Sequence, residues 1–302
     1  MTSHHIIGQL LLLGQRIWSN LVLFIVDLSL IWKKKLFINC YVVRKHNDIC
    51  HINWGDDINY YFLGMICSKK IVVKNKSLLY KFIPASNYCC IGSTLGDFID
   101  SRTEIWGSGI ISADKIIDRQ PFKIHSVRGP LTRDILLKNN IQCPEIYGDP
   151  ALLLSKVYQP KTHSRYRTGI VLHYVDSNNT IIKDYVHQHR DSVIINMRGY
   201  DCWTDVIDLI CSCDIILSSS LHGLIVADSY GIPNLWIGLS NNLTGGDFKF
   251  YDYFASVSRS ETKIQIRNIC DIENLDLSDI KNNSSINFES IISSCPFDIQ
   301  IS

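Results

Sequence analysis

The sequence has almost no excess charge of either sign, because 30 lysine and arginine residues stand against 29 aspartate and glutamate residues among 302. A polyanion binder usually carries a basic excess, so we expect no nucleic-acid partner. The chain is 46% hydrophobic and 20% charged, which argues against low-hydropathy disorder. Its length instead predicts about two domains, each large enough for a buried core.

The cysteines lack the arrangement of a disulfide framework or a zinc site. There are eleven, an odd number, scattered from Cys40 to Cys295. The close pairs at 89–90 and 211–213 do not have the two-residue gap that structural zinc sites share. We therefore expect no metal site and a reduced, cytoplasmic protein.

A membrane-spanning helix is also lacking. Residues 9–32 are largely apolar, but Arg16 and Asp27 interrupt them. The uninterrupted apolar run is only Leu21–Val26, far short of the roughly 20 residues that a span needs. No cleavage site of a signal peptide follows. The segment predicts either an amphipathic helix packed on the domain or a helix on a membrane surface, with Lys33–Lys35 against anionic lipid.

Short β-rich runs alternate with helical stretches from residue 36 onward, which predicts an α/β fold. We expect two Rossmann-like domains of parallel strands that face each other across a cleft, with residues 1–160 and 161–302 joined by the polar stretch Gln159–Arg167. The expected strands are Leu36–Val43, Ile71–Val73, Tyr88–Ile91, Glu104–Trp106, Lys123–Val127, Gly169–Tyr174, Ser192–Met197, Asp214–Leu217 and Asn234–Ile237. The expected helices are Asp57–Ile66, Pro130–Lys138, Ile181–His189, Thr204–Cys213, Leu221–Tyr230, Phe248–Ala255 and one within Ile286–Cys295 that docks on either domain.

Ligands of such folds bind at the carboxyl ends of strands, where helix N-termini present unpaired N–H groups. The sharpest strand-to-helix turn is Ser218–Gly223, in which serines can cap a helix. His222 falls in the first helical turn, where it can protonate or hydrogen-bond an anion. The alternative is a serine cap beside a histidine that only packs.

Two further turns carry candidate residues. Arg128 stands at the start of a helix and could bind a phosphate or carboxylate through two N–H groups, unless it is a solvated arginine. In Asn53–Asn59, Gly55 permits close backbone approach, and Asp56 or Asp57 can cap the helix.

The remaining motif signals are weaker. The stretch Gly107–Gly109 lacks the third glycine of a dinucleotide fingerprint, because Ser112 stands there. Asp149 is expected to point toward the region between the domains, or to be a plain turn residue. The sequence motifs of P-loop kinases, serine hydrolases and zinc proteases are not found.

Taken together, the turn sequences resemble the polysaccharide pyruvyl transferase family in order and spacing over residues 45–300. The resemblance implies a two-domain GT-B-like fold. It also implies transfer of the enolpyruvyl unit of phosphoenolpyruvate onto a sugar of a surface polysaccharide or its lipid-linked repeat unit, as a pyruvate ketal, with no cofactor besides the donor. The segments that carry it are NWGDDIN (53–59), IGS (91–93), WGSG (106–109), VRGPLTRDIL (127–136), GDPALLL (148–154), SSSLHGLIVADSYGIP (218–233) and FKFYDYFASV (248–257).

By position, the resemblance implies that His222 is the catalytic acid. Asp149 or an aspartate of the 53–59 turn is expected to be the base. Many members carry arginine where Ser220 stands, so Arg128 or Arg198 is expected to hold the donor carboxylate instead. The residues expected to bind substrate are Arg128, Ser218, Ser219, Ser220, Leu221, Gly223, Gly55, Asp56, Asn59, Gly107, Ser108, Gly109 and Arg198.

Two other functions stay open from the sequence. A GT-B glycosyltransferase that uses a nucleotide sugar shares the same architecture, and fold does not decide function. The other possibility is that the chain is a non-catalytic relative that acts as an assembly partner. Its only support is Ser220, which stands where many members carry arginine. A lipid-linked acceptor would give the apolar first segment a reason to lie at the inner face of the plasma membrane.

Overall fold

The computed structural model describes residues 34–45, 48–77, 80, 82–160, 165–240 and 242–301, together with Trp18 and Leu21. Trp18 and Leu21 are helical and exposed, and the rest of the apolar segment 9–32 lies outside the described residues. None of the described helices is long and apolar enough to cross a membrane. All eleven cysteines are free thiols.

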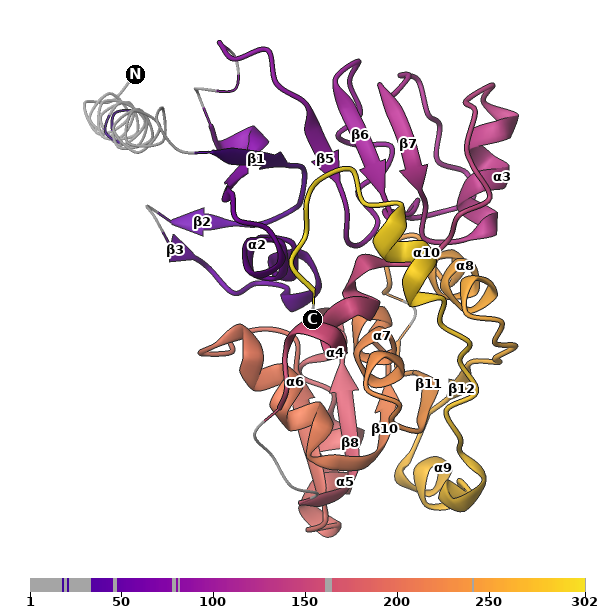
Figure 1. The fold of residues 1–302 in the computed structure, drawn as a ribbon. Coiled ribbons are helices and arrows are strands. Elements are labelled where there is room, and N and C mark those ends of the chain that lie inside the picture. The colour runs from indigo at the N-terminus through magenta and orange to yellow at the C-terminus, as the bar shows by residue number, and fades with distance from the viewer. Residues whose placement is uncertain are drawn as a thin grey trace, which may run out of the picture.

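The first half of the chain forms a five-stranded parallel sheet in the order β4-β1-β5-β6-β7 (Figure 1). Its strands lie close to the expected runs, except that the first one ends at Ile38 rather than Val43. The chain turns away there because Asn39, itself buried, bonds the Asn87 side chain. The strands are β1 (Lys35–Ile38), β4 (Lys70–Val73), β5 (Asn87–Cys89), β6 (Thr103–Trp106) and β7 (Lys123–Ser126).

The second half forms another five-stranded parallel sheet, in the order β12-β11-β10-β8-β9. Its first strand begins at Tyr166, so the last two residues of the expected linker belong to the sheet. The strands are β8 (Tyr166–Leu172), β9 (Ser192–Asn196), β10 (Cys213–Ser218), β11 (Asn234–Gly238) and β12 (Ile264–Gln265). The α/β class with two parallel layers is therefore confirmed. The last strand and a small antiparallel pair, β2 (Arg44–Lys45) and β3 (Asp48–Ile49), were not expected.

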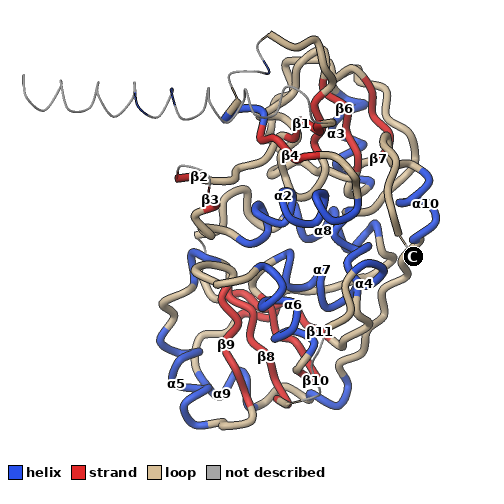
Figure 2. Tube along the Cα trace, turned by 60° about the vertical axis from the view of Figure 1, so that its left-hand side comes forward, coloured by secondary structure: helices blue, strands red, loops and turns tan. Residues whose placement is uncertain are grey.

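Helices lie between the two sheets and on their outer faces. Figure 2 shows α2, α7 and α8 between the sheets. The largest hydrophobic cluster spans both halves, from Trp54 and Trp106 to Val171 and Trp236. The helices are α2 (Trp54–Ile66), α3 (Pro130–Lys138), α4 (Leu154–Val157), α5 (Thr180–Gln188), α6 (Trp203–Cys211), α7 (Leu221–Ser229), α8 (Phe248–Ser256), α9 (Ile269–Glu273) and α10 (Phe288–Ser293).

Two segments after residue 247, helix α8 and residues 288–301, contact the first half. Helix α8 packs against α3, and the Trp106 indole N–H donates to the carbonyl of Ile291 in α10 at 2.9 Å. The Gln300 N–H donates to the carbonyl of Ile66 at 2.7 Å. The last helix therefore docks on the first half, one of the two positions expected for it.

Candidate active site

Each sheet has a topological switch point, where consecutive strands are added on opposite sides of the first strand. Both switch points lie next to one cavity. Strands β4 and β5 flank β1, and strands β9 and β10 flank β8. Ligands bind at such switch points, beyond the carboxyl ends of the strands. The residues that follow β1, β5, β8 and β10 there include Tyr41, Ser93, His173 and Ser220, and all four line the cavity.

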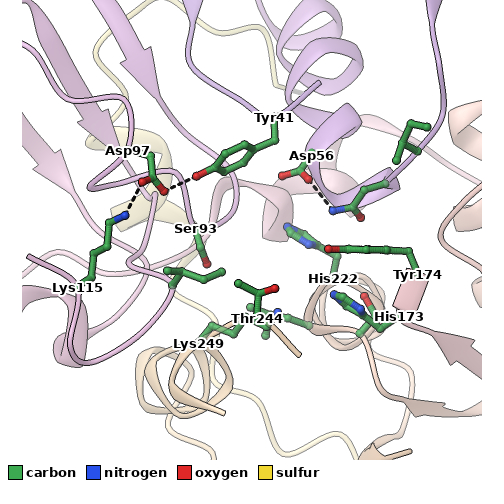
Figure 3. Close-up of a pocket in the computed structure, with 15 residues that line it drawn as sticks. Tyr41, Asp56, Ser93, Asp97, Lys115, His173, Tyr174, His222, Thr244 and Lys249 are labelled. Carbon is green, nitrogen blue, oxygen red and sulfur yellow. Dashed lines mark hydrogen bonds and ion pairs between the residues drawn. The ribbon is translucent and has the colours of Figure 1, made fainter. Parts of the chain in front are cut away.

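The cavity has a volume of about 510 Å³ and is lined by residues of both halves (Figure 3). Four of the expected site residues reach its lining, namely Asp56, Ser220, Leu221 and His222. The lining as a whole consists of Tyr41, Ile52, Asn53, Asp56, Ser93, Asp97, Ile111 and Lys115 from the first half, and His173, Tyr174, Ser220, Leu221, His222, Thr244 and Lys249 from the second.

His222 lies in the first turn of α7, as expected from the serine-rich turn. Two glycines surround its ring: a Cβ on Gly55 would lie 2.2 Å from the His222 Nδ1, and a Cβ on Gly92 would lie 3.7 Å from its Cε1. The His222 Nε2 is buried and has no hydrogen-bond partner among the described residues. Of the five buried side-chain atoms without a partner among the described residues, it is the one whose residue lines the cavity. A buried polar atom of this kind is rare in folded proteins and calls for an explanation, such as a catalytic role.

The electrostatic surroundings of His222 keep its imidazole neutral. Burial first, and then the positive charges of Lys249 and Arg128, lower its pKa to about 3. Burial and Lys249 also lower the pKa of His173 to about 3. Both histidines of the cavity are therefore uncharged at neutral pH in the free protein.

Lys249 lines the cavity but was not among the site residues expected from the sequence. It lies in the first turn of α8, is only 8% exposed, and makes no hydrogen bond or ion pair with any described residue. Burial, followed by the charge of Arg128, lowers its pKa to about 8, against the charges of Asp56 and Asp247, which raise it. One feature of the sequence could have indicated Lys249: it belongs to FKFYDYFASV, one of the segments that resemble the family.

The start of α2 differs from the expectation. The helix begins at Trp54, and Asn53 caps it by accepting a hydrogen bond from the Gly55 N–H at 3.3 Å. Neither Asp56 nor Asp57 is the cap, because both lie inside the first turn. The Asn53 amide also donates a hydrogen bond to the Asp56 carboxylate at 2.6 Å. Because Asp56 does not cap the helix, its carboxylate can line the cavity.

The two aspartates of this turn have different surroundings. Burial raises the pKa of Asp56 to about 6, against the hydrogen bond from Asn53, which lowers it. Asp57 instead accepts a hydrogen bond from the Tyr200 hydroxyl at 2.7 Å and so links the two halves. Asp56 is therefore the aspartate of this turn that can act on a bound ligand.

Arg128 lies behind the cavity rather than in its lining. It is fully buried and donates to three groups, the Asp252 carboxylate at 2.9 Å, the Ser93 hydroxyl at 2.6 Å and the Ile110 carbonyl at 2.8 Å. Gly109 makes room for it, since a Cβ there would lie 2.3 Å from the guanidinium carbon. These contacts make Arg128 a link between α8 and the Ser93 loop.

Other expected site residues support the loop at residues 91–93. The Asn59 amide pairs with the backbone of Ile91, accepting from its N–H at 3.0 Å and donating to its carbonyl at 3.1 Å. The fully buried Asp149 accepts from the Gly92 N–H at 3.3 Å and from the Ala151 N–H at 3.0 Å. The Ser108 hydroxyl donates to the Gly92 carbonyl at 3.0 Å. These residues hold the loop without lining the cavity.

The rest of the expected set shapes the backbone or lies elsewhere. Ser218 accepts from the Ser220 N–H, and Ser219 accepts from the His173 N–H. Gly223 lets α7 approach β8, because a Cβ there would lie 2.7 Å from the Val171 side chain. Gly107 has a φ of +80° and lies against Pro150. Arg198 is exposed and does not line the cavity.

The other end of the cavity carries a polar network. Asp97 accepts hydrogen bonds from the Tyr41 hydroxyl and from the Lys115 ammonium group (Figure 3). Burial alone would raise the pKa of Asp97, but these two donors lower it. The charges of Lys115 and Asp97 compensate each other, unlike that of Lys249. No cluster of three or more potential metal ligands occurs among the described residues.

Comparisons with known proteins identify the family. The sequence model of the family described as polysaccharide pyruvyl transferase matches residues 23–241. The chain is also similar to the uncharacterized protein L143 of Acanthamoeba polyphaga mimivirus. The two share 30% identity over 261 residues, which cover 82% of this chain and 85% of the viral protein.

Proposed function

The chain belongs to the polysaccharide pyruvyl transferase family, and we propose that it moves the enolpyruvyl unit of phosphoenolpyruvate onto a sugar of a surface polysaccharide, or of its lipid-linked repeat unit, to form a pyruvate ketal. The observation that carries the proposal is the buried Nε2 of His222, which has no hydrogen-bond partner among the described residues. The same cavity holds Lys249, which has no ion pair within that part of the chain. An imidazole beside a cation suits an anionic donor that must receive a proton. We propose no cofactor besides this donor.

The proton step begins with the change that the donor makes to His222. In the free protein the imidazole is neutral, since its pKa is lowered to about 3. The negative charges of a bound phosphate and carboxylate favour the imidazolium form and raise that pKa. The protonated His222 then transfers its proton to the terminal carbon of the enol phosphate, which leaves positive charge on the central carbon.

Two hydroxyl groups of the sugar complete the reaction. The first hydroxyl oxygen bonds to the central carbon, and its proton passes to Asp56, whose pKa of about 6 leaves it ionised at neutral pH. The bond between that carbon and the phosphate oxygen then breaks. Inorganic phosphate leaves with the proton of the second hydroxyl, whose oxygen closes the ketal. The N–H groups at the start of α7 stabilise the departing phosphate.

Asp149 is the weaker choice for the base. It does not line the cavity, and both of its oxygens accept hydrogen bonds from backbone N–H groups. We therefore assign it a positioning role at the Gly92 loop. We also propose that the two halves are arranged as in GT-B proteins, with the domain boundary near residue 160.

Ligand-dependent unfolding tests the donor. The purified protein is unfolded by heat with phosphoenolpyruvate, inorganic phosphate, pyruvate, UDP-glucose or UDP-galactose. A ligand at a hundred times its dissociation constant stabilises by about 2.7 kcal/mol, which shifts the midpoint by several degrees. We expect the largest shift with phosphoenolpyruvate. A shift with a nucleotide sugar alone would replace this proposal with a glycosyltransferase.

We also propose peripheral attachment to the inner face of the plasma membrane. Lys34 precedes β1, Lys70 begins β4 and Lys123 begins β7, so all three lie where strands of the first parallel sheet begin, at its amino-terminal end. Phe122, beside Lys123, is 67% exposed. Basic residues near a surface attract anionic lipid with about 1 kcal/mol each.

Vesicle sedimentation tests this location. At low salt we expect retention on anionic vesicles but not on neutral ones, and weaker retention of a variant with all three lysines replaced by glutamine. Equal recovery of the unbound protein with both kinds of vesicle would contradict attachment.

A further inference from the structure

We infer that Lys249 binds an anionic group of the donor, its phosphate or its carboxylate. The inference rests on the proposed function, because it names the cation at the same site. It differs from the sequence-based expectation, which assigned this task to Arg128 or Arg198. The reasons are the contacts of each positive residue in and around the cavity.

The lining contains two lysines and no arginine. Lys115 is already bonded to Asp97. Arg128 is fully buried behind the Ser93 loop and uses its Nε and both Nη atoms in three hydrogen bonds within the protein. Lys249 is the lining residue whose positive charge has no ion pair with a described residue.

The position of Lys249 is unfavourable unless an anion binds there. The residue is only 8% exposed, and burying an ammonium group that has no hydrogen bond or ion pair with a described residue is costly. The Phe250 ring, whose centroid lies 5.6 Å from the Lys249 Nζ, and the charges of Asp56 and Asp247 offset only part of this cost. Lys249 also lies in the first turn of α8, where the positive end of the helix dipole repels a cation. A bound anion offsets both penalties, because it supplies the opposite charge next to the ammonium group.

Helix α8 holds this lysine in a fixed place. Asp252, one turn further along, accepts hydrogen bonds from the Thr132 N–H at 2.8 Å and the Thr132 hydroxyl at 2.7 Å. The Phe250 ring stacks on Trp236 with centroids 4.6 Å apart. The backbone that carries Lys249 is therefore fixed before the ligand arrives, and the Lys249 Nζ lies 5.6 Å from the centroid of the Phe250 ring.

Binding at Lys249 also connects to His222. The charge of Lys249 is the largest charge effect that lowers the His222 pKa. An anion on Lys249 cancels much of that repulsion, so the donor itself prepares the histidine for proton transfer. Lys249 of α8 thus supplies the positive charge for the donor that an arginine at position 220, next to the histidine, would otherwise supply.

The test compares equilibrium binding of phosphoenolpyruvate, inorganic phosphate and oxalate to the wild type and to three variants, Lys249→Met, Lys249→Met/Ser220→Arg and Lys183→Met. The last is the matched control, because Lys183 is exposed on α5 and does not line the cavity. A charge-assisted hydrogen bond predicts that Lys249→Met binds phosphoenolpyruvate about 10- to 100-fold more weakly. The double variant should regain part of the affinity. If Lys249→Met loses only phosphate binding, Lys249 binds the phosphate group of the donor. If it loses only oxalate binding, Lys249 binds the carboxylate.

Two further readouts separate binding from structural support. The affinity of the wild type should fall as the pH rises above about 8, because the lysine must be protonated to bind, and Lys249→Arg should remove this dependence. Without ligand, Lys249→Met should unfold at the same temperature as the wild type or higher, since it removes an unpaired buried charge.

The outcomes distinguish this inference from the proposed function. Equal binding of phosphoenolpyruvate by the wild type and Lys249→Met overturns the inference and leaves the proposed function standing. If the wild type binds phosphate but not phosphoenolpyruvate, and Lys249→Met loses phosphate, the anion site stands and the proposed donor falls. If the wild type binds none of the three, both fall.

Discussion

Replacing His222 with alanine is expected to lower the rate of pyruvyl transfer by about 10²- to 10⁴-fold, the usual contribution of a positioned acid. The Nε2 atom bonds to no described residue, so the substitution breaks no hydrogen bond at that atom. The fold should persist, as judged by circular dichroism and by binding of phosphoenolpyruvate. The rate is measured as acceptor-dependent phosphate release.

A second substitution tests the same residue without removing it. A Cβ at Gly55 would lie 2.2 Å from the His222 Nδ1, so Gly55→Ala must displace the ring. We expect Gly55→Ala to lose most of the activity as well. His187→Ala is the matched control, because His187 is exposed on α5 and away from the cavity lining. A rate near that of the wild type in His222→Ala would remove His222 from the mechanism.

Replacing Arg128 with methionine is expected to destabilise the protein by about 3–5 kcal/mol, the usual cost of removing one partner of a buried ion pair. The substitution leaves the Asp252 carboxylate buried without its cation, and leaves the Ser93 hydroxyl and the Ile110 carbonyl without a donor. The measurement is the free energy of unfolding in urea. This large effect follows from the place of Arg128 between α8 and the first half.

The double variant Arg128→Met/Asp252→Asn is the control for Arg128. It removes the uncompensated charge and keeps an acceptor for Thr132, so part of the lost stability should return. A loss below about 1 kcal/mol in Arg128→Met, the range of an exposed ion pair, would contradict the structural role. Arg128 would then be free for the donor, as first expected from the sequence.

The alternation of apolar runs predicted the two parallel sheets well. Each expected strand has a counterpart, because buried strands in parallel sheets are short continuous apolar runs rich in β-branched residues, such as Ile71–Val73 in β4. The two-residue strand β12 and the five-residue helix α9 were missed, because neither is long enough to show a period. The boundaries of α2 and β8 were each misplaced by three residues.

The candidate site was predicted less completely than the fold. His222 and Asp56 reach the cavity as expected, because both follow the rule that ligands bind at strand-to-helix turns. Tyr41 and His173 also line the cavity, but the rule missed them, because the expected strands extended past the true ends of β1 at Ile38 and β8 at Leu172. Lys249 could not be found in this way, because it reaches the cavity through the packing of α8 on α3, a contact between distant parts of the chain.

A motif also does not tell which of its residues touch the ligand. Arg128, Asp149 and Asn59 lie in segments typical of the family, yet the structure places all three behind the cavity. Their side chains bond to backbone groups or to a buried carboxylate. They hold the Ser93 loop and α8 in place, and sequence alone does not separate such support from contact with substrate.

The most direct test of the central claim follows the carbon atoms of the donor. Phosphoenolpyruvate labelled with ¹³C at its central carbon is incubated with the protein and a pool of surface glycans, and the glycans are analysed by NMR. We predict that the label appears in the glycan as a ketal carbon, with one inorganic phosphate released for each label transferred. Label that stays in phosphoenolpyruvate, while a nucleotide sugar is consumed in the same pool, would contradict the account.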